Sequence, residues 1–124
     1  FFTKRGSAVV RVQIRPWGAE DALVTVSSEV VAGAKLEFDL LHQLLRTNQE
    51  AIFGAFSLTE DGTITLRHSL FGSTMDRDEL VSAIMAVSRT ADDWDDRIIK
   101  SFGGQTTLGR LQGKADEPPS EPDA

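Results

Sequence analysis

The stretch FGAFSLTEDGTITLRHSLFG, residues 53–72, decides the fold class. Apolar and polar residues alternate on both sides of Glu60-Asp61-Gly62, and a period of two is typical of half-buried strands. The residues from Thr59 to Gly62 predict a turn of about three to five residues with glycine at positive φ. The stretch therefore predicts a β-hairpin, and nothing in it has the pattern of a reactive site.

The same alternation predicts strands upstream of the hairpin. Residues 8–14 alternate around Val10, Val12 and Ile14, and residues 22–31 are rich in β-branched side chains. We expect Pro16-Trp17-Gly18 to end the first of these strands, because proline removes a donor from the ladder. Residues 1–5 are a candidate short first strand. The first third of the chain thus predicts three strands.

A leucine pattern follows Gly33 and predicts a helix within residues 35–50, ending near Asn48. Leucines recur every four residues and are flanked by two more, and a stripe this broad predicts a helix lying on a sheet. These leucines are Leu36, Leu40, Leu41, Leu44 and Leu45.

The last helix has the clearest signals. Asp76 can cap its start with Glu79 three residues on, Met75 and Leu80 occupy the two staple positions, and Gly103-Gly104 ends it. A helix of this length is about 39 Å long, enough to cross a five-stranded sheet. The apolar face of the helix consists of Leu80, Ile84, Val87, Ala91, Trp94 and Ile98.

The elements read β-β-β-α-β-β-α, which predicts an α+β domain with an antiparallel sheet of about five strands and helices packed on it. We expect one domain over residues 1–104 and a flexible, acidic, proline-rich tail over residues 105–124. Gly54, inside the hairpin, is interpreted as a point where the final helix crosses a strand closely.

Composition limits the class of protein. The net charge of −6 and the pI near 4.8 disfavour nucleic-acid or anionic-membrane partners. There is no cysteine, so disulfides and thiolate chemistry are excluded. No apolar run approaches the roughly 18 residues of a membrane span, and no signal peptide is visible at Phe1. These features favour a cytoplasmic location.

The acidic run DDWDD, Asp92 to Asp96, is the obvious chemical candidate. Asp92 lies three and four residues from Asp95 and Asp96, so the three carboxylates share one side of a helix. The favoured interpretation is a solvated helix face laced with ion pairs to nearby basic residues. The alternative is a divalent-cation or small-ligand sensor, because hard oxygens bind Mg²⁺ and Ca²⁺.

The two histidines, His42 and His68, share no ligand spacing. His68 reads as a partly buried, hydrogen-bonded strand residue, His42 as the edge of the leucine stripe, and Trp94 as a core residue. GGQTTLG follows a helix and lacks the lysine of a phosphate loop. We expect no catalytic residue, no cofactor and no metal site.

Residues 44–104 resemble the YbjN family, which is related in fold to the chaperones of type III secretion. The resemblance lies in Asn48, Phe53-Gly54-Ala55-Phe56, Leu66-Arg67-His68-Ser69, Ala91-Asp92 and Phe102-Gly103-Gly104. It implies an additional opening helix, which is absent before Phe1. It also implies a regulator of sensory transduction, whose relatives in secretion bind extended peptides and act as dimers.

The resemblance implies a non-enzymatic protein- or peptide-binding module, chaperone-like or a regulatory adaptor, and a homodimer. The hairpin is then a platform that supplies a sheet edge or a groove to a peptide. An enzyme that brings His68 beside an acid from another element is a further alternative. So is a structural domain of a larger assembly.

Overall fold

The computed structural model describes residues 1–109 and confirms the predicted order of strands and helices. Every strand pairing in it is antiparallel, and the sheet order is β1-β2-β3-β5-β4. The fold is therefore α+β, as expected. The elements are β1 (Phe2–Arg5), β2 (Ala8–Trp17), β3 (Asp21–Val31), α1 (Phe38–Glu50), β4 (Ala55–Leu58), β5 (Ile64–Phe71) and α2 (Arg77–Phe102).

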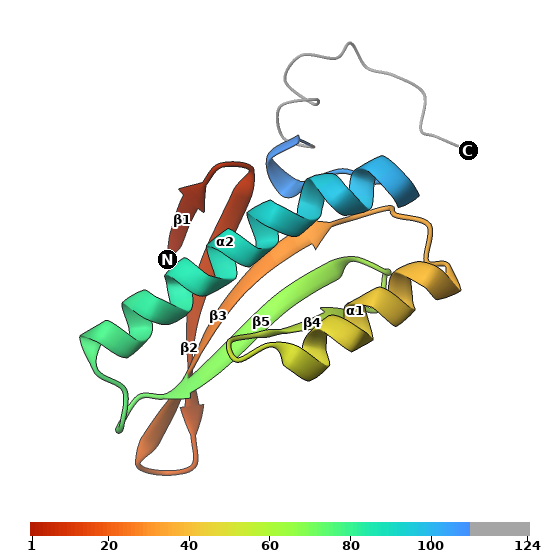
Figure 1. The fold of residues 1–124 in the computed structure, drawn as a ribbon. Coiled ribbons are helices and arrows are strands. Elements are labelled where there is room, and N and C mark those ends of the chain that lie inside the picture. The colour runs from red at the N-terminus through yellow and green to blue at the C-terminus, as the bar shows by residue number, and fades with distance from the viewer. Residues whose placement is uncertain (110–124) are drawn as a thin grey trace.

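Both helices lie over the same face of the sheet (Figure 1). α2 packs across the central strands, whereas α1 lies beside the edge strand β4. Side chains from both helices and from the sheet form one core, because the apolar stripe of each helix can be buried only against another element. The core consists of Ala8, Val10, Val26, Val30, Val31, Leu40, Leu44, Phe56, Ile64, Leu66, Ala83, Val87, Ala91 and Ile98.

α2 follows its local signals closely. Asp76 is the N-cap, and its Oδ1 accepts a hydrogen bond of 2.8 Å from the backbone N–H of Glu79. Gly103 ends the helix with φ 77°, a left-handed conformation that favours glycine. Val87 and Ala91 on the predicted apolar face are fully buried. The helix is therefore fixed at both ends and along one side.

β2 is longer than expected. It runs through Pro16, which still pairs with Ala22 of β3, so the expectation that Pro16-Trp17-Gly18 ends the strand is wrong. β1 pairs only with Ala8 to Arg11 of β2, and the later part of β2 is a sheet edge. Proline is tolerated at an edge, because its missing N–H costs no ladder bond on the open side.

α1 differs from the prediction in its stripe and its end. Leu40 and Leu44 are buried, but Leu36 precedes the helix and Leu45 is 69% exposed. The helix contacts the edge of the sheet at β4 and does not lie across it, so a narrow stripe is enough to hold it. It ends at Glu50, and no non-glycine residue of the described chain has positive φ, so Asn48 is not a left-handed terminus.

Gly54 precedes β4 and has φ 82°. A Cβ there would lie 3.4 Å from the carbonyl oxygen of Arg67 and 3.4 Å from the Leu66 side chain. Its close neighbour is therefore β5, and the interpretation that α2 crosses at this glycine is wrong. The hairpin turn behaves as predicted, with Gly62 at φ 84°.

The described chain stays in contact with the sheet beyond Gly104. Gln105 pairs with Ala32 through two backbone hydrogen bonds, and the Thr107 hydroxyl donates to Glu29. Most of the predicted tail, residues 110–124, lies outside the described residues. Its flexibility and the domain boundary at residue 104 stay predictions.

Candidate functional site

A groove runs between α2 on one side and α1 with the following loop on the other. It consists of three hollows: the middle one shares Trp94 with one neighbour and Phe53 with the other. The middle hollow has a volume of about 430 Å³. It is lined by Thr47, Asn48, Glu50, Ala51, Ile52, Phe53, Gly54, Phe56, Leu66, Ala86, Thr90 and Trp94.

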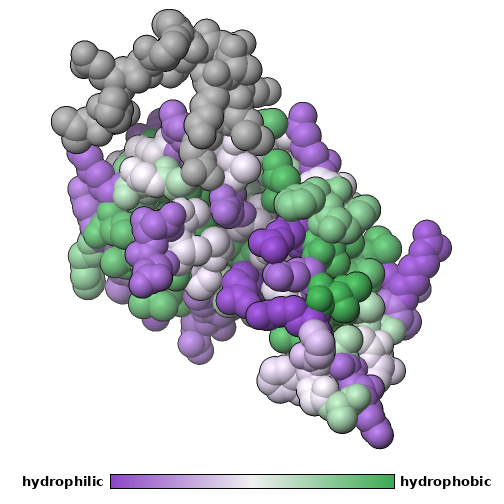
Figure 2. Space-filling view, turned by 180° about the vertical axis from the view of Figure 1, so that it is seen from behind, coloured by the Kyte–Doolittle hydropathy of each residue, from purple (hydrophilic) through white to green (hydrophobic). Residues whose placement is uncertain are grey.

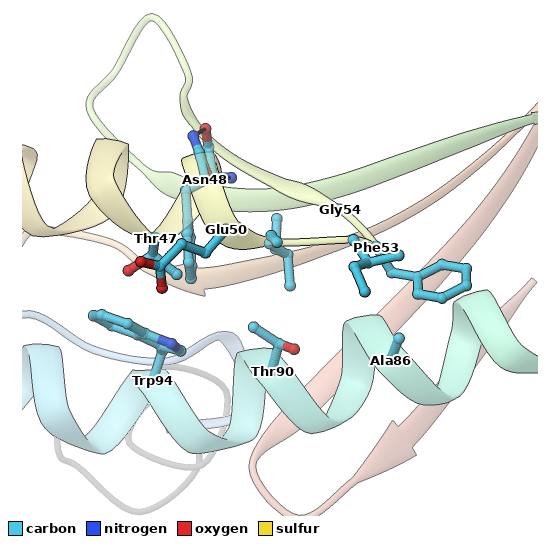
Figure 3. Close-up of a pocket in the computed structure, with 12 residues that line it drawn as sticks. Thr47, Asn48, Glu50, Phe53, Gly54, Ala86, Thr90 and Trp94 are labelled. Atoms are coloured by element: carbon cyan, nitrogen blue, oxygen red, sulfur yellow. Dashed lines mark hydrogen bonds between the residues drawn. The ribbon is translucent and has the colours of Figure 1, made fainter.

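Figure 3 shows the two walls of this hollow. Thr47, Glu50 and Phe53 come from the end of α1 and its loop, and Ala86, Thr90 and Trp94 come from successive turns of α2 facing them. Because the α2 residues recur every four positions, a single stripe of that helix faces the groove along its length. The groove is therefore a product of two helices that are held apart on one sheet.

The floor of the groove is aromatic and apolar. The rings of Phe56 and Trp94 meet edge to face with centroids 5.4 Å apart. The guanidinium of Arg97 lies 4.0 Å from the centroid of the Trp94 ring. Trp94 packs against the core as predicted, but it also forms part of the groove wall. Such a surface offers apolar contact area without any nucleophile or acid–base pair.

Asn48 pairs with the outer edge of β4. Its Oδ1 accepts from the backbone N–H of Phe56 at 2.7 Å, and its Nδ2 donates to the Phe56 carbonyl at 3.0 Å. An added strand would need these same two groups. The Asn48 side chain thus takes the place of a neighbouring strand at the centre of β4.

His68 holds the loop that borders the groove. Its Nδ1 accepts a hydrogen bond of 3.1 Å from the backbone N–H of Gly54, and its ring lies 5.2 Å from the ring of Phe53. The prediction of a partly buried, hydrogen-bonded strand histidine is confirmed. His42, in contrast, is exposed and stacks on Phe38.

The acidic run turns toward the β1–β2 turn. Asp92 Oδ1 accepts from both the backbone N–H and the hydroxyl of Ser7, each at 2.9 Å, and the same hydroxyl contacts Asp95 Oδ2. Asp95 is only 1% exposed, so the interpretation of the run as a solvated helix face is wrong for this residue. The turn at Ser7 packs on α2 and excludes water from the Asp95 carboxyl.

Burial raises the pKa of the Asp95 carboxyl above its ordinary value of 3.8; the Ser7 hydrogen bond opposes this, and the charges of Asp96 and Asp92 add to it. Geometry points the same way. Ser7 has one hydroxyl proton for two carboxylates, so a proton on Asp95 lets it donate to Ser7 while Ser7 donates to Asp92. Asp95 Oδ1 has no hydrogen-bond partner within the described chain.

This arrangement does not form a metal site. Among residues 1–109 no group of three or more His, Cys, Asp or Glu side chains is placed to hold an ion. Asp96 is exposed, whereas Asp95 is buried. The fold thus brings Asp92 and Asp95 together at Ser7 and leaves Asp96 exposed.

The other face of the sheet is not covered by either helix. Figure 2 looks at this face and shows hydrophilic side chains across its middle. Register places Arg11, Ser27 and Arg67 in one cross-strand row there. A hollow of about 500 Å³ lies on this face and includes serine, threonine and arginine side chains. Phe2, Val9 and Leu58 also line it, so this hollow combines apolar side chains with polar and charged ones.

The fold and the groove together define a class: a small α+β domain that offers a groove between its two helices. Residues 2–110 match the TY-Chap1 family, described as T3SS (YopN, CesT) and YbjN peptide-binding chaperone 1. The chain belongs to this family. The predicted resemblance to YbjN and to type III secretion chaperones is therefore confirmed.

A search of curated proteins found no match to this chain. Within residues 1–109, neither helix combines the length and the apolarity that a bilayer-spanning helix needs.

Two residues of the site were not identified from sequence. Asn48 was part of the family resemblance but was interpreted as a helix terminus, and Ser7 was not singled out. Asn48 forms hydrogen bonds with Phe56 on another element, and Ser7 contacts Asp95, which is distant in sequence. No local sequence pattern predicts either partner.

Proposed function

We propose that this protein is a non-enzymatic peptide-binding module, chaperone-like or a regulatory adaptor, that holds an extended apolar segment of a client protein in the groove between α1 and α2. The observation that carries the proposal is the row of three hollows joined at Trp94 and Phe53, with Phe56 and Leu66 lining the middle one. An apolar groove is one of the recurring ways in which proteins bind peptides. Membership in a peptide-binding chaperone family supports it.

The groove is a better candidate than the sheet edge at β4. Strand addition there would have to displace Asn48 from both backbone groups of Phe56. The edge strand is also only four residues long, from Ala55 to Leu58. Peptide capture in the groove requires no such displacement.

Cation sensing by Asp92, Asp95 and Asp96 is less favoured. Asp92 and Asp95 already bind Ser7, and binding a cation would require this buried contact to open. A thermal shift with Ca²⁺ or Mg²⁺ that disappears in Asp92→Asn would revive this function, since a ligand that binds only the native state stabilises it.

The proposal extends to assembly and location. We propose a homodimer that acts in the cytoplasm on protein or peptide partners. Support for a dimer comes from the outer side of α1, where Phe38 and Leu45 are 77% and 69% exposed and lie seven residues apart on one side of the helix. The acidic net charge disfavours nucleic acid and anionic membranes as partners.

Binding of fluorescent apolar peptides of about ten residues, followed by anisotropy, tests the function; this length spans the groove at about 3.3 Å per residue. Ala86→Glu places a carboxylate in the middle of the groove and should weaken binding at least tenfold, because the charge loses water when a peptide covers it. Val81→Glu is the matched control, an exposed position of the same helix outside the groove lining. Equal weakening by both variants would contradict a groove site.

A further inference from the structure

The charged residues that line the groove are separated by sign. At the end beside the start of α1, Arg97 and Lys100 line the hollow together with Gln43. At the opposite end, Asp78 and Glu79 line it together with Asp76, which caps α2. The charged residues of the groove lining therefore form a basic end and an acidic end.

An apolar section separates these ends. Phe56, Leu66 and Trp94 lie in the middle hollow, and Phe53 continues into the acidic end, where Leu70 joins the lining. The one charged side chain in the middle hollow is Glu50, on the wall formed by α1. Apart from a position that faces Glu50, this lining favours a ligand that is apolar at its centre and charged at its ends.

The length of the groove sets the length of the ligand. Glu79 and Phe102 lie at opposite ends of the lining and on one helix, so they are about 35 Å apart at about 1.5 Å per residue. An extended peptide advances about 3.3 Å per residue. Roughly ten residues therefore span the groove from the basic end to the acidic end.

We infer that the groove selects and orients its ligand by charge: an extended segment of about ten residues, apolar in the middle, with its acidic end at Arg97 and Lys100 and its basic end at Asp78 and Glu79. This inference rests on the proposed function and adds the chemistry of the peptide to it. Both charged pairs are on the solvent-exposed rim, so they guide orientation more than they add affinity.

Arg97 is well placed for this role. Its guanidinium is stacked on Trp94, which holds the side chain at the groove and leaves the N–H groups at its rim available to a carboxylate. Asp78 and Glu79 are in the first turn of α2 and exposed, whereas the Asp76 carboxylate is already used by the cap. The two ends of the groove thus present fixed charges of opposite sign.

The test compares two peptides of equal composition on the full chain. One has a glutamate pair at one end and a lysine pair at the other; the second has one glutamate and one lysine at each end. The segregated peptide should bind about fivefold more tightly at low salt, and the difference should shrink in about 0.5 M salt because exposed charges are screened.

A spin label reports orientation. Placed on the acidic end of the segregated peptide, it should broaden the amide signals of Arg97, Lys100 and their neighbours; placed on the basic end, it should broaden those of Asp78 and Glu79. This readout does not depend on whether the peptide backbone runs in one direction or the other.

Asp78→Asn together with Glu79→Gln should reduce the advantage of the segregated peptide to about twofold, as expected for the loss of one of two exposed charge contacts. Glu20→Gln with Glu60→Gln makes the same change in net charge in two exposed turns outside the groove and should leave the advantage intact.

The outcomes separate the two proposals. If both peptides bind with equal affinity and neither labelled end prefers one end of the groove, the charge inference is overturned while peptide binding stands. If neither peptide binds, the proposed function itself fails and the inference falls with it.

Discussion

Asn48 satisfies a backbone donor and a backbone acceptor of β4 with one side chain. Asp95 is the opposite case, because one of its oxygens is buried without a hydrogen bond from residues 1–109 and burial disfavours its charged form. A substitution at either residue is expected to change the stability of the protein without changing its fold.

Asn48→Ala should lower the free energy of unfolding by about 1–3 kcal/mol, because two backbone groups at Phe56 lose their partners. Urea unfolding measures the change, and Gln49→Ala at the next, exposed position of α1 is the control. If both variants have the same stability, the pairing of Asn48 with β4 contributes nothing.

Asp95→Asn should change the pH dependence of stability. The folded pKa of Asp95 is raised above 3.8, so above that pH the folded state holds a proton that the unfolded state releases. This contribution to stability is present at low pH and is lost as pH rises through the folded pKa. The variant should therefore remove that loss and be relatively more stable at neutral pH.

Thermal unfolding at a series of pH values measures the effect, with Asp93→Asn, an exposed neighbour, as the control. Ser7, Asp92 and Asp96 are the groups that act on the carboxyl, and all are retained in both variants. A pH profile of Asp95→Asn parallel to that of the parent would refute the burial of a protonated acid.

At the scale of elements, helices and strands were predicted accurately where their signals act between residues close in the chain, and less accurately where distant residues decide. α2 was predicted from its cap to its terminal glycine, because both signals involve neighbouring residues. The apolar stripe predicted for α1 is too broad. Leu45 is exposed because the helix overlaps only the edge of the sheet, and the extent of that overlap is not a local property of the sequence. The Pro16 error has the same origin: whether a strand is an edge is decided by its partner.

The end of α2 gives a test of element packing. Gly103 and Gly104 have φ 77° and 99°, but a Cβ at Gly103 would meet nothing within 4 Å, whereas one at Gly104 would lie 2.7 Å from the Ala32 carbonyl oxygen. Gly103→Ala should cost about 1 kcal/mol of stability from conformational strain alone.

Gly104→Ala should cost at least about 3 kcal/mol, because the clash separates the end of α2 from β3 and its pairing at Gln105. Denaturant unfolding of the two variants measures the difference. Equal losses of stability in the two variants would mean that the contact between this end of α2 and β3 can rearrange at little cost in free energy.

At the scale of the whole molecule, the groove exists because α1 and α2 occupy one face without closing on each other (Figures 1 and 3). Neither helix carries the site alone. The same arrangement leaves the outer side of α1 exposed, which is the basis of the proposed dimer.

Light scattering should give twice the mass of the single chain, and Leu45→Lys should reduce it to one chain, because a lysine at the centre of an apolar contact loses its hydration. Ile14→Lys, at an equally exposed apolar position on β2, should leave the mass unchanged. A dimer that persists in Leu45→Lys would place the interface elsewhere.

The sequence by itself determined the strands, both helices, their order and the α+β class, because alternation, caps and turn glycines act between residues close in the chain. The tertiary structure alone decided that Asn48 would pair with β4, that Ser7 would bury Asp95, and that two helices would leave a groove with oppositely charged ends. Those features depend on groups distant in sequence, whose meeting is set by the packing of helices on the sheet.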